Sequence, residues 1–141
     1  MEEYHFDNGS FYTGNMKDEL FHGEGVFTFH NKDIYKGSFE MDNMHGKGVY
    51  TYVGGDKYEG TFKNDKFDGI GKYIYNDGTY SIGRYSNDMR NGKFVYKYTD
   101  GTLNECVYQQ DKLVNEPKHI TENDVKSGKY SKIGIKTMDD L

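Results

Sequence analysis

Glycine recurs along this chain at a fixed interval of 23 residues. The interval separates Gly14 from Gly37 and Gly23 from Gly46, and aromatic residues keep the same period. A strict period of this length is typical of a repeat architecture, in which each copy is one supersecondary unit and neighbouring copies bury a shared core. The registered columns are Gly14, Gly37, Gly60 and Gly83; Gly23, Gly46, Gly69 and Gly92; Phe27, Tyr50, Tyr73 and Tyr96; and Phe29, Tyr52, Tyr75 and Tyr98.

The composition favours short strands over helices within each copy. The 141 residues include 14 Tyr, 9 Phe and 18 Gly, but only one Pro. Aromatic residues separated by Gly, Asn and Asp are typical of strands joined by tight turns, and pairs such as Asn8-Gly9 and Asp77-Gly78 are hairpin turn signals. The predicted fold is therefore all-β: an elongated single-layer antiparallel sheet of consecutive β-hairpins with a short, irregular or partly helical C-terminal tail. Ten or so strands would make a ribbon on the order of 45 Å long.

Strand alternation places rings and glycines on the same face of this sheet. Tyr12 and Gly14 share one face of the first run, and Gly25 and Phe27 share one face of the second. A glycine inside a strand is unfavourable unless something covers its bare backbone. We therefore expect a ring from a neighbouring strand to lie flat over each glycine. The other face is predicted to be mixed and polar, with Thr13, Glu24, Val26, Thr28, Lys36, Lys47, Glu59 and Lys72.

The repeats predict a domain boundary near residue 115. Segment 1–115 holds about four and a half copies, since the chain opens with Tyr4 on the second strand of an incomplete hairpin and the fifth copy is residual. Pro117 falls where a strand-interior glycine would stand, and proline cannot donate to a ladder. The sheet is therefore expected to end near Gln110.

The C-terminal tail, residues 116–141, gives mixed signals. Thr121 and Asp124 ahead of Gly128 favour one helical turn, whereas Tyr130 to Ile135 alternate like a strand. Three positions for the tail are open: across the aromatic face, on a partner protein, or against the last strand as a cap.

Two short motifs alternate along the chain, Tyr-x-Gly and His-Gly-x-Gly. The copies are Tyr12-x-Gly14 with His22-Gly23-x-Gly25, Tyr35-x-Gly37 with His45-Gly46-x-Gly48, and Tyr58-x-Gly60 with Gly69-x-Gly71. This pattern resembles the MORN repeat (membrane occupation and recognition nexus) over residues 4–110. Copies three and four depart from it at four positions: Asp68 and Asn91 replace the histidine, Ser81 replaces the tyrosine and Phe94 replaces a glycine.

The resemblance implies a non-enzymatic scaffold or adaptor that binds other proteins. Similar chains are components of cytoskeletal, basal-body or ciliary axonemal assemblies, so the implied location is cytoplasmic, in the cytoskeleton or a cilium. The family's name suggests an alternative, a phosphoinositide or membrane-surface binding module. A third hypothesis is a targeting domain separated from the catalytic half of an enzyme.

Charge argues against nucleic acid and disfavours an anionic membrane. The chain has 18 Lys and Arg against 23 Asp and Glu, a net charge of −5, and no cluster of basic residues is visible in the sequence. The acidic start Met-Glu-Glu does not read as a secretory signal. The single cysteine, Cys106, fits a reducing compartment. A cytoplasmic protein is expected.

No catalytic, metal-binding or cofactor-binding residue is predicted. His22 and His45 fall two strands, about 10 Å, apart, too far to share one metal ion. The histidine of this column, or the Asp68 or Asn91 that replaces it, is expected to hydrogen-bond the backbone at the loop before the glycine. Cys106 is expected to be a buried small hydrophobe. An acidic ladder at one fixed loop position is interpreted as turn-forming rather than as a divalent-ion stripe. The acidic ladder consists of Glu19, Asp42, Asp65, Asp88 and Asp111.

The aromatic face is the predicted partner-binding surface. A single layer leaves this face without an opposing layer, so either its rings tile one another as a core or they form a groove for a helical or extended partner segment. Strand addition at the N-terminal edge, beside Glu2 and Glu3, is an alternative, and homo-oligomerisation is left open. The predicted partner-binding residues are Tyr12, Phe27, Tyr35, Phe39, Tyr50, Tyr52, Tyr58, Phe62, Tyr73 and Tyr75.

Overall fold

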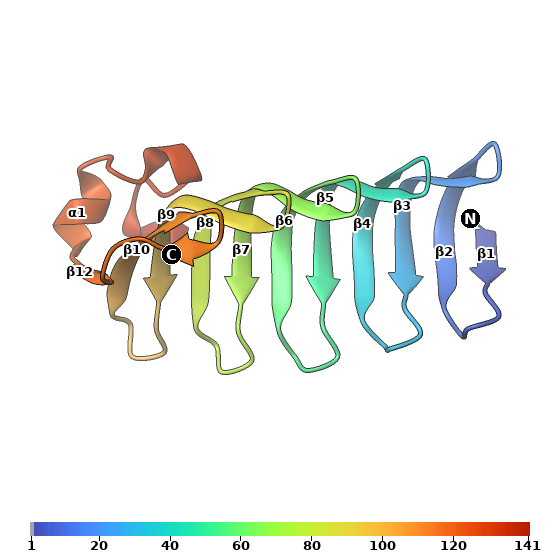
Figure 1. The fold of residues 1–141 in the computed structure, drawn as a ribbon, viewed down its shortest axis with the longest axis horizontal. Coiled ribbons are helices and arrows are strands. Elements are labelled where there is room, and N and C mark those ends of the chain that lie inside the picture. The colour runs from blue at the N-terminus through green and yellow to red at the C-terminus, as the bar shows by residue number, and fades with distance from the viewer. Residues whose placement is uncertain (1) are drawn as a thin grey trace.

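The computed structural model describes residues 2–141, which form one antiparallel sheet of 12 strands and a short tail. Strands β1 to β11 pair in chain order along the long axis of the molecule (Figure 1), and β12 pairs with β10. The predicted all-β sheet of consecutive hairpins with a partly helical tail is confirmed. The strands are β1 (Glu2–His5), β2 (Phe11–Lys17), β3 (Leu20–Thr28), β4 (Ile34–Glu40), β5 (Asn43–Thr51), β6 (Lys57–Lys63), β7 (Lys66–Ile74), β8 (Tyr80–Ser86), β9 (Met89–Lys97), β10 (Leu103–Gln109), β11 (Lys112–Leu113) and β12 (Lys118–Ile120).

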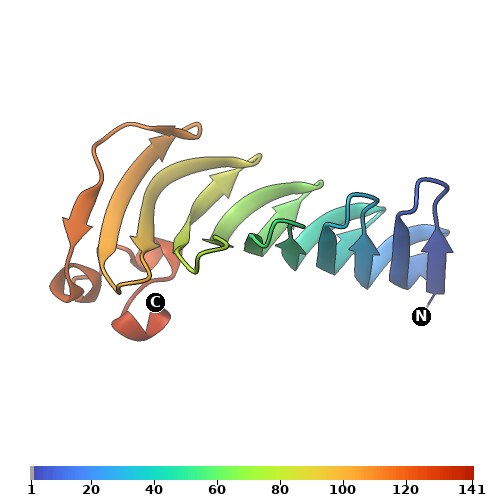
Figure 2. The same cartoon turned by 90° about the horizontal axis from the view of Figure 1, so that it is seen from below.

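Each hairpin bends at a register shift between its two strands. In the first hairpin Gly14 pairs with Gly25, but Met16 pairs with Phe21, and Gly23 within the shift has a φ of +84°. A bulge of this kind bends a strand and increases its twist. Figure 2 shows the resulting curvature in every long hairpin. Equivalent shifts occur in the β4–β5, β6–β7 and β8–β9 hairpins.

The bend divides each hairpin into two arms. The loop arm (residues 11–14 with 25–28 in the first hairpin) ends at the longer loops, and the turn arm (residues 16–17 with 20–22) ends at the two-residue turns. The aromatic face lies inside the bend, because Phe21 of the turn arm and Phe27 of the loop arm approach to 5.9 Å between ring centroids.

Tyrosine rings fill the corner of the bend and cover the strand glycines. A Cβ atom added at Gly25 would overlap the ring of Tyr12, which is fully buried. Phe21 stacks on Tyr12 at 3.9 Å between centroids, and Phe39 meets it edge-on at 5.2 Å. The expectation that rings lie over glycine backbone is confirmed. The same contact joins Tyr35 to Gly48 and Tyr58 to Gly71.

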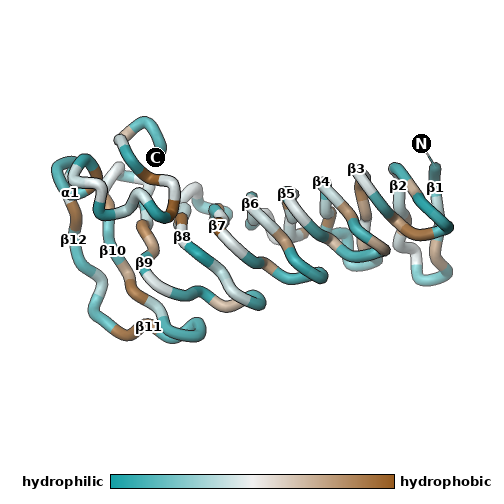
Figure 3. Tube along the Cα trace, turned by 90° about the horizontal axis from the view of Figure 1, so that it is seen from above, coloured by the Kyte–Doolittle hydropathy of each residue, from teal (hydrophilic) through white to brown (hydrophobic). Residues whose placement is uncertain are grey.

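This core does not stand out on a hydropathy scale. Figure 3 colours most of the chain teal or white, because tyrosine and glycine do not score as hydrophobic, and the mean hydropathy is −0.97. Nevertheless, Tyr12, Tyr35 and Tyr58 have no exposed surface. The stability of the sheet therefore depends on amphipathic rings whose hydroxyl groups find partners, rather than on aliphatic side chains.

The tail caps the last long strand and covers the face opposite the rings. Strand β12 pairs with β10, with Leu103 opposite Ile120. Ile120, Val125 and Ile135 pack in one cluster with Val95 and Leu103. Because Val95 lies between the aromatic-face residues Phe94 and Tyr96, alternation places this cluster on the other side of the sheet. Of the three positions considered for the tail, the structure therefore has it against the last strand.

The expectations about the C-terminal part had different outcomes. The prediction that the sheet ends near Gln110 is wrong, because β11 and β12 both pair with β10 and Pro117 lies just before β12 begins. The helical turn after Thr121 is confirmed as α1 (Glu122–Lys126), with a capping box between Thr121 and Asp124. The strand-like alternation further on is instead the 3-10 helix η1 (Ser131–Ile133), which is followed by η2 (Met138–Asp140). The boundary at residue 115 stays a prediction.

Candidate functional site: an acidic aromatic groove

Half of the predicted contact residues form the floor of the groove inside the bend. Tyr12, Tyr35 and Tyr58 are fully buried, and Phe39 and Phe62 are 5% and 3% exposed. The tyrosine hydroxyls donate to backbone carbonyls three residues on, for example from Tyr35 to Ser38 at 2.7 Å. In the free chain these rings tile one another as a core, so their surface is not available to a partner.

The other five predicted contact residues line the loop arm and are half-buried: Phe27, Tyr50, Tyr52, Tyr73 and Tyr75. Their rings form a continuous series once Phe29 is included, which joins Phe27 to Tyr50. Neighbouring centroids lie 4.8 Å apart from Tyr50 to Tyr52 and 6.1 Å apart from Tyr52 to Tyr73. Burial raises the pKa of the Tyr75 hydroxyl to about 12. This hydroxyl is therefore neutral at physiological pH. We call these five half-buried residues the wall of the groove. The wall combines partly exposed rings with uncharged hydroxyls.

Loop aspartates that the sequence analysis did not single out hold this wall in place. Asp33 is 6% exposed, and its carboxylate accepts hydrogen bonds from the Tyr50 hydroxyl at 2.8 Å and the Val53 N–H at 2.8 Å. One period later, Asp56 accepts from the Tyr73 hydroxyl at 2.9 Å. The 23-residue spacing of these two aspartates is visible in the sequence. An aspartate in a loop is too common, however, to indicate a tyrosine partner 17 residues further along the chain.

Replacing Asp33 by asparagine is expected to destabilise the protein in a pH-dependent way. Burial raises the pKa of Asp33, but hydrogen bonds from the Val53 N–H, the Tyr50 hydroxyl and the Asn31 amide outweigh it, so the pKa lies below its ordinary value. The carboxylate then stabilises the fold fully above about pH 4, by about 1–3 kcal/mol, and this contribution is lost as the pH falls through the lowered pKa.

Urea unfolding of both proteins at about pH 7 and about pH 3 measures this difference. The gap between Asp33→Asn and the unsubstituted protein should be present at the higher pH and narrow at the lower one. Asp77→Asn is the control, because the exposed Asp77 carboxylate accepts from the N–H of Thr79 in its own loop. An Asp33→Asn gap of equal size at both pH values would contradict the assignment.

The acidic ladder follows the edge of the turn arms and joins successive hairpins. Met41 and Asp42 both have positive φ, as a two-residue hairpin turn requires. The Asp42 carboxylate accepts from the Phe21 N–H at 2.7 Å, and the Asp42 N–H donates to the Phe21 carbonyl at 2.9 Å. The turn-forming interpretation is confirmed, and from Asp42 onward each turn also clamps the preceding hairpin. The equivalent pairs are Asp65 with Met44, Asp88 with Phe67 and Asp111 with Arg90.

Three hollows lie in series along the aromatic face, between the wall and the acidic ladder. We call this surface the aromatic groove. The hollows have volumes of about 270, 360 and 260 Å³. Every residue of the acidic ladder lines at least one of them. The linings are Tyr4, Phe6, Met16, Glu19, Phe21 and Asp42; Phe21, Phe27, Phe29, Phe39, Asp42, Met44 and Asp65; and Phe67, Tyr73, Tyr75, Tyr85, Asp88, Arg90 and Asp111.

The fourth hairpin reverses the contact between ring and glycine. Ser81 stands in the tyrosine column and is 1% exposed, while Phe94 stands in a glycine column and is fully buried. A Cβ atom added at Gly83 would overlap the Phe94 ring. The ring therefore reaches the corner from the opposite strand, and the departures at Ser81 and Phe94 compensate for each other.

Comparison with known families agrees with this geometry. A family model for the MORN repeat matches residues 12–34, 35–57, 58–80 and 82–103, which together make up more than half of the chain. The chain belongs to the MORN repeat family. MORN repeats are a non-catalytic repeat type and are generally protein-binding or membrane-binding scaffold modules. A search of curated proteins finds no match. Within residues 2–141, no helix has the length and apolar character needed to cross a membrane.

The histidine column of the MORN motif makes local contacts. His45 Nε2 lies 3.4 Å from the Glu40 carboxylate. In the copies without histidine, Asp68 accepts from the Asn87 N–H at 3.3 Å and Asn91 accepts from the Gln110 N–H at 2.9 Å, so backbone hydrogen bonding at this column is confirmed for these two residues. Among the described residues, no group of three or more His, Cys, Asp or Glu could hold a metal ion.

Cys106 occupies a glycine column of the fifth, residual MORN copy. It is 5% exposed and packs in the aromatic cluster beside Phe94 and Tyr108. Burial raises the pKa of its thiol, which disfavours the nucleophilic thiolate. The expected role as a buried small hydrophobe is confirmed.

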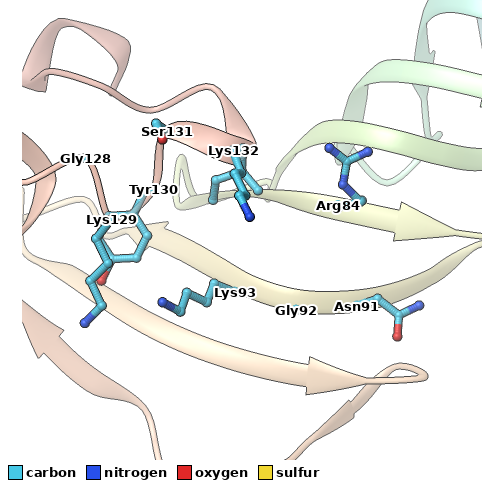
Figure 4. A pocket seen from close by; sticks show the side chains of 10 residues that line it. Arg84, Asn91, Gly92, Lys93, Gly128, Lys129, Tyr130, Ser131 and Lys132 are labelled. Atoms are coloured by element: carbon cyan, nitrogen blue, oxygen red, sulfur yellow. The ribbon is translucent and has the colours of Figure 1, made fainter.

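A cationic cleft lies on the face opposite the MORN aromatic groove, where the tail meets β8 and β9. Arg84 of β8, Lys93 of β9 and Lys132 of η1 line a cleft of about 460 Å³ together with Lys129 (Figure 4). The Lys129 ammonium lies 3.6 Å from the Glu105 carboxylate. The statement that no basic residues cluster is therefore wrong: the tail folds back and brings residues together that are far apart in the sequence.

Proposed function

We propose that this protein is a non-enzymatic scaffold or adaptor that binds a segment of a partner protein in the aromatic groove. The observation that carries the proposal is the series of three hollows, each lined by aromatic rings that are exposed or half-buried, on a face that the tail leaves open. Half-buried aromatic rings beside such hollows provide the anchor sites on which protein interfaces depend most strongly. The family's general role as a protein-binding or membrane-binding scaffold supports the same function.

The rigidity of the sheet suits a structural subunit of a larger assembly. Each hairpin is joined to the next by strand pairing and by the turn clamps, so the groove is held in shape before any partner arrives. A preformed groove lowers the ordering cost of binding. The resemblance to cytoskeletal and ciliary axonemal components extends the proposal to a cytoplasmic assembly of that kind. Strand addition at the outer edge of β1 is an alternative mode of assembly, for a partner protein or for a second copy of the chain.

Photo-crosslinking from the groove wall tests the proposed function. A photoreactive amino acid replaces Tyr52, just after the end of β5, in one protein and Val49, on the opposite face of β5, in the other. We expect position 52 to crosslink reproducibly to one protein from the native source, and position 49 not to do so. The crosslinked protein, purified separately, should bind the unsubstituted chain and bind the Tyr52→Ala/Tyr75→Ala variant at least about tenfold more weakly.

The control for that variant is Val49→Ala/Ile70→Ala, which shortens two side chains on the opposite face. It should bind the partner as the unsubstituted chain does. Equal loss in both variants would show a general effect on folding, and unchanged affinity in the tyrosine variant would overturn the groove proposal. Crosslinks that map to β1 instead would favour strand addition.

The cationic cleft supports a second candidate function, binding of a phosphoinositide or another anionic membrane surface. Arg84, Lys93 and Lys132 all line it although the chain as a whole is acidic. The unsubstituted protein and the Lys93→Ala/Lys132→Ala variant are each floated with phosphatidylcholine vesicles, with and without phosphoinositide. Salt-sensitive co-flotation that Lys93→Ala/Lys132→Ala abolishes would establish this second function. Absence of co-flotation would exclude it and leave the scaffold proposal in place.

A further inference from the structure

The acidic ladder gives the aromatic groove one sign of charge. Glu19, Asp42, Asp65 and Asp88 are exposed and line the hollows. Among the described lining residues the one cation is Arg90, which pairs with Asp111 at 2.6 Å. At Asp42, Asp65 and Asp88, one carboxylate oxygen accepts the N–H of the preceding hairpin. The second oxygen remains available, so the groove presents a row of unneutralised carboxylates beside apolar rings.

The spacing of these carboxylates is fixed by the fold. Each hairpin contributes one ladder residue and two strands, and neighbouring strands lie about 4.8 Å apart, so successive carboxylates are separated by about 10 Å along the groove. A binding segment that runs along the groove must offer its complementary groups at the same interval.

An α-helix meets this interval with a seven-residue spacing. The helix rises 1.5 Å per residue, so seven residues span about 10.5 Å and return the side chain to nearly the same face after two turns. A β-strand spans the interval in about three residues, an odd number that points successive side chains to opposite sides. A helix therefore presents one cation per carboxylate and turns a continuous apolar stripe toward the rings, which a strand does not do.

We propose that the occupant of the aromatic groove is an amphipathic helix of a partner protein with a lysine or arginine at every seventh residue beside its apolar stripe. The proposal rests on the proposed function and specifies the chemistry of its partner. The apolar stripe contacts the half-buried wall, and the basic side chains reach the acidic ladder on three successive hairpins.

Designed helical peptides of about three heptads, long enough for three hairpins, test the spacing. The matching peptide has leucine and phenylalanine in the apolar stripe and one lysine per heptad at its border. We expect it to bind the full chain, more weakly as salt is raised, and at least about tenfold more tightly than a peptide with glutamate at the lysine positions. A peptide of the same composition with its lysines opposite the stripe should bind about as weakly as the glutamate peptide.

A proline-rich peptide with lysine at every third residue provides the competing geometry. A polyproline helix also returns to the same face at this interval, about 9 Å for three residues, but has a narrower apolar stripe. Tighter binding of this peptide than of the matching helix would overturn the assignment of an α-helix. Equal binding of the lysine and glutamate helices would overturn the role of charge.

The protein side is tested with Asp42→Asn/Asp65→Asn/Asp88→Asn. Asparagine keeps a carbonyl oxygen to accept the same backbone N–H but removes the charge, so the turn clamps are retained. We expect the matching peptide to bind this variant about tenfold more weakly and to lose most of its salt dependence. The matched control, Asp7→Asn/Asp77→Asn/Asp100→Asn, removes three exposed charges from loops at the other edge of the sheet and should leave binding unchanged.

Failure of this inference is distinguishable from failure of the proposed function. A native partner that crosslinks to position 52 but carries no helix of this pattern would overturn the inference and leave the scaffold function standing. Binding of the matching peptide in the absence of any native groove partner would overturn the proposed function, although the groove would still have the stated selectivity for a basic amphipathic helix. Unchanged affinity in the triple asparagine variant would overturn the inference directly.

Discussion

Replacing Tyr35 by alanine is expected to lower the free energy of unfolding by about 3–5 kcal/mol, the range for removing a large buried ring. Tyr35 is fully buried, and its ring covers Gly48. It also meets Phe39 and Phe62 edge-on, with centroids 5.1 and 4.9 Å away. The substitution removes all of these contacts and leaves the Ser38 carbonyl without the hydroxyl that donates to it. Because domains of this size are stable by about 5–15 kcal/mol, much of the stability would be lost.

Urea unfolding followed by circular dichroism and by tyrosine fluorescence measures this loss. Tyr35→Phe is the matched control, since it keeps the ring and removes only the hydrogen bond to Ser38, which is worth about 1 kcal/mol. Tyr52→Ala, on the half-buried wall, should have a smaller effect than Tyr35→Ala. If Tyr35→Ala were no less stable than Tyr35→Phe, the ring would not be part of the core.

Exchanging the ring between the two strands of the second hairpin should rescue two damaging substitutions. Gly48→Phe alone forces a ring into the space that Tyr35 occupies and is expected to cost about 3 kcal/mol or more. Tyr35→Ser alone should destabilise nearly as much as Tyr35→Ala. The double variant reproduces the Ser81 and Phe94 arrangement of the fourth hairpin, so the phenylalanine can occupy the space that the tyrosine vacates.

A double-mutant cycle reports this exchange as a favourable coupling of about 2–3 kcal/mol, at the upper end of the usual range for residues in contact. Gly48→Ala and Gly54→Ala measure how much a Cβ atom alone lowers the free energy of unfolding at a covered glycine and at an open one. A Cβ at Gly48 overlaps the Tyr35 ring, whereas nothing lies within 4 Å of a Cβ at Gly54. Additive destabilisation in the double variant would mean that the fourth hairpin tolerates its departures for a different reason.

The sequence predicts the architecture well because the information is periodic and local. The 23-residue interval, the turn dipeptides and the alternation of rings with glycines are enough for a single-layer sheet of hairpins with rings on one face. The contact of Tyr12 with Gly25 follows from the pairing of their columns. Pattern reasoning succeeded for the columns of rings and glycines, whose contacts follow from strand alternation and pairing.

The parts that could not be predicted depend on contacts outside this local pattern. Alternation alone does not show that the strand turns at Gly23, whose positive φ bends the hairpin and makes the aromatic face concave. The burial of Asp33 depends on Tyr50 and Val53 of the next copy. The cationic cleft depends on a tail whose route carries no repeat. The sequence also does not show how deeply each ring is buried. Tyr35 and Tyr52 look equivalent in the sequence, but only Tyr52 retains exposed surface with which to contact a partner.

The strands lie across the long axis of the molecule, so the hydrogen bonds between neighbouring hairpins run along it (Figure 1). A tensile load applied between the two ends would pull along these hydrogen bonds. The pairs of strands would then separate one after another. Each 23-residue copy that detaches would lengthen the chain by roughly 70 Å, the span of its extended backbone less the width it filled in the sheet. An assembly held together by this chain would therefore yield in separate steps of equal length.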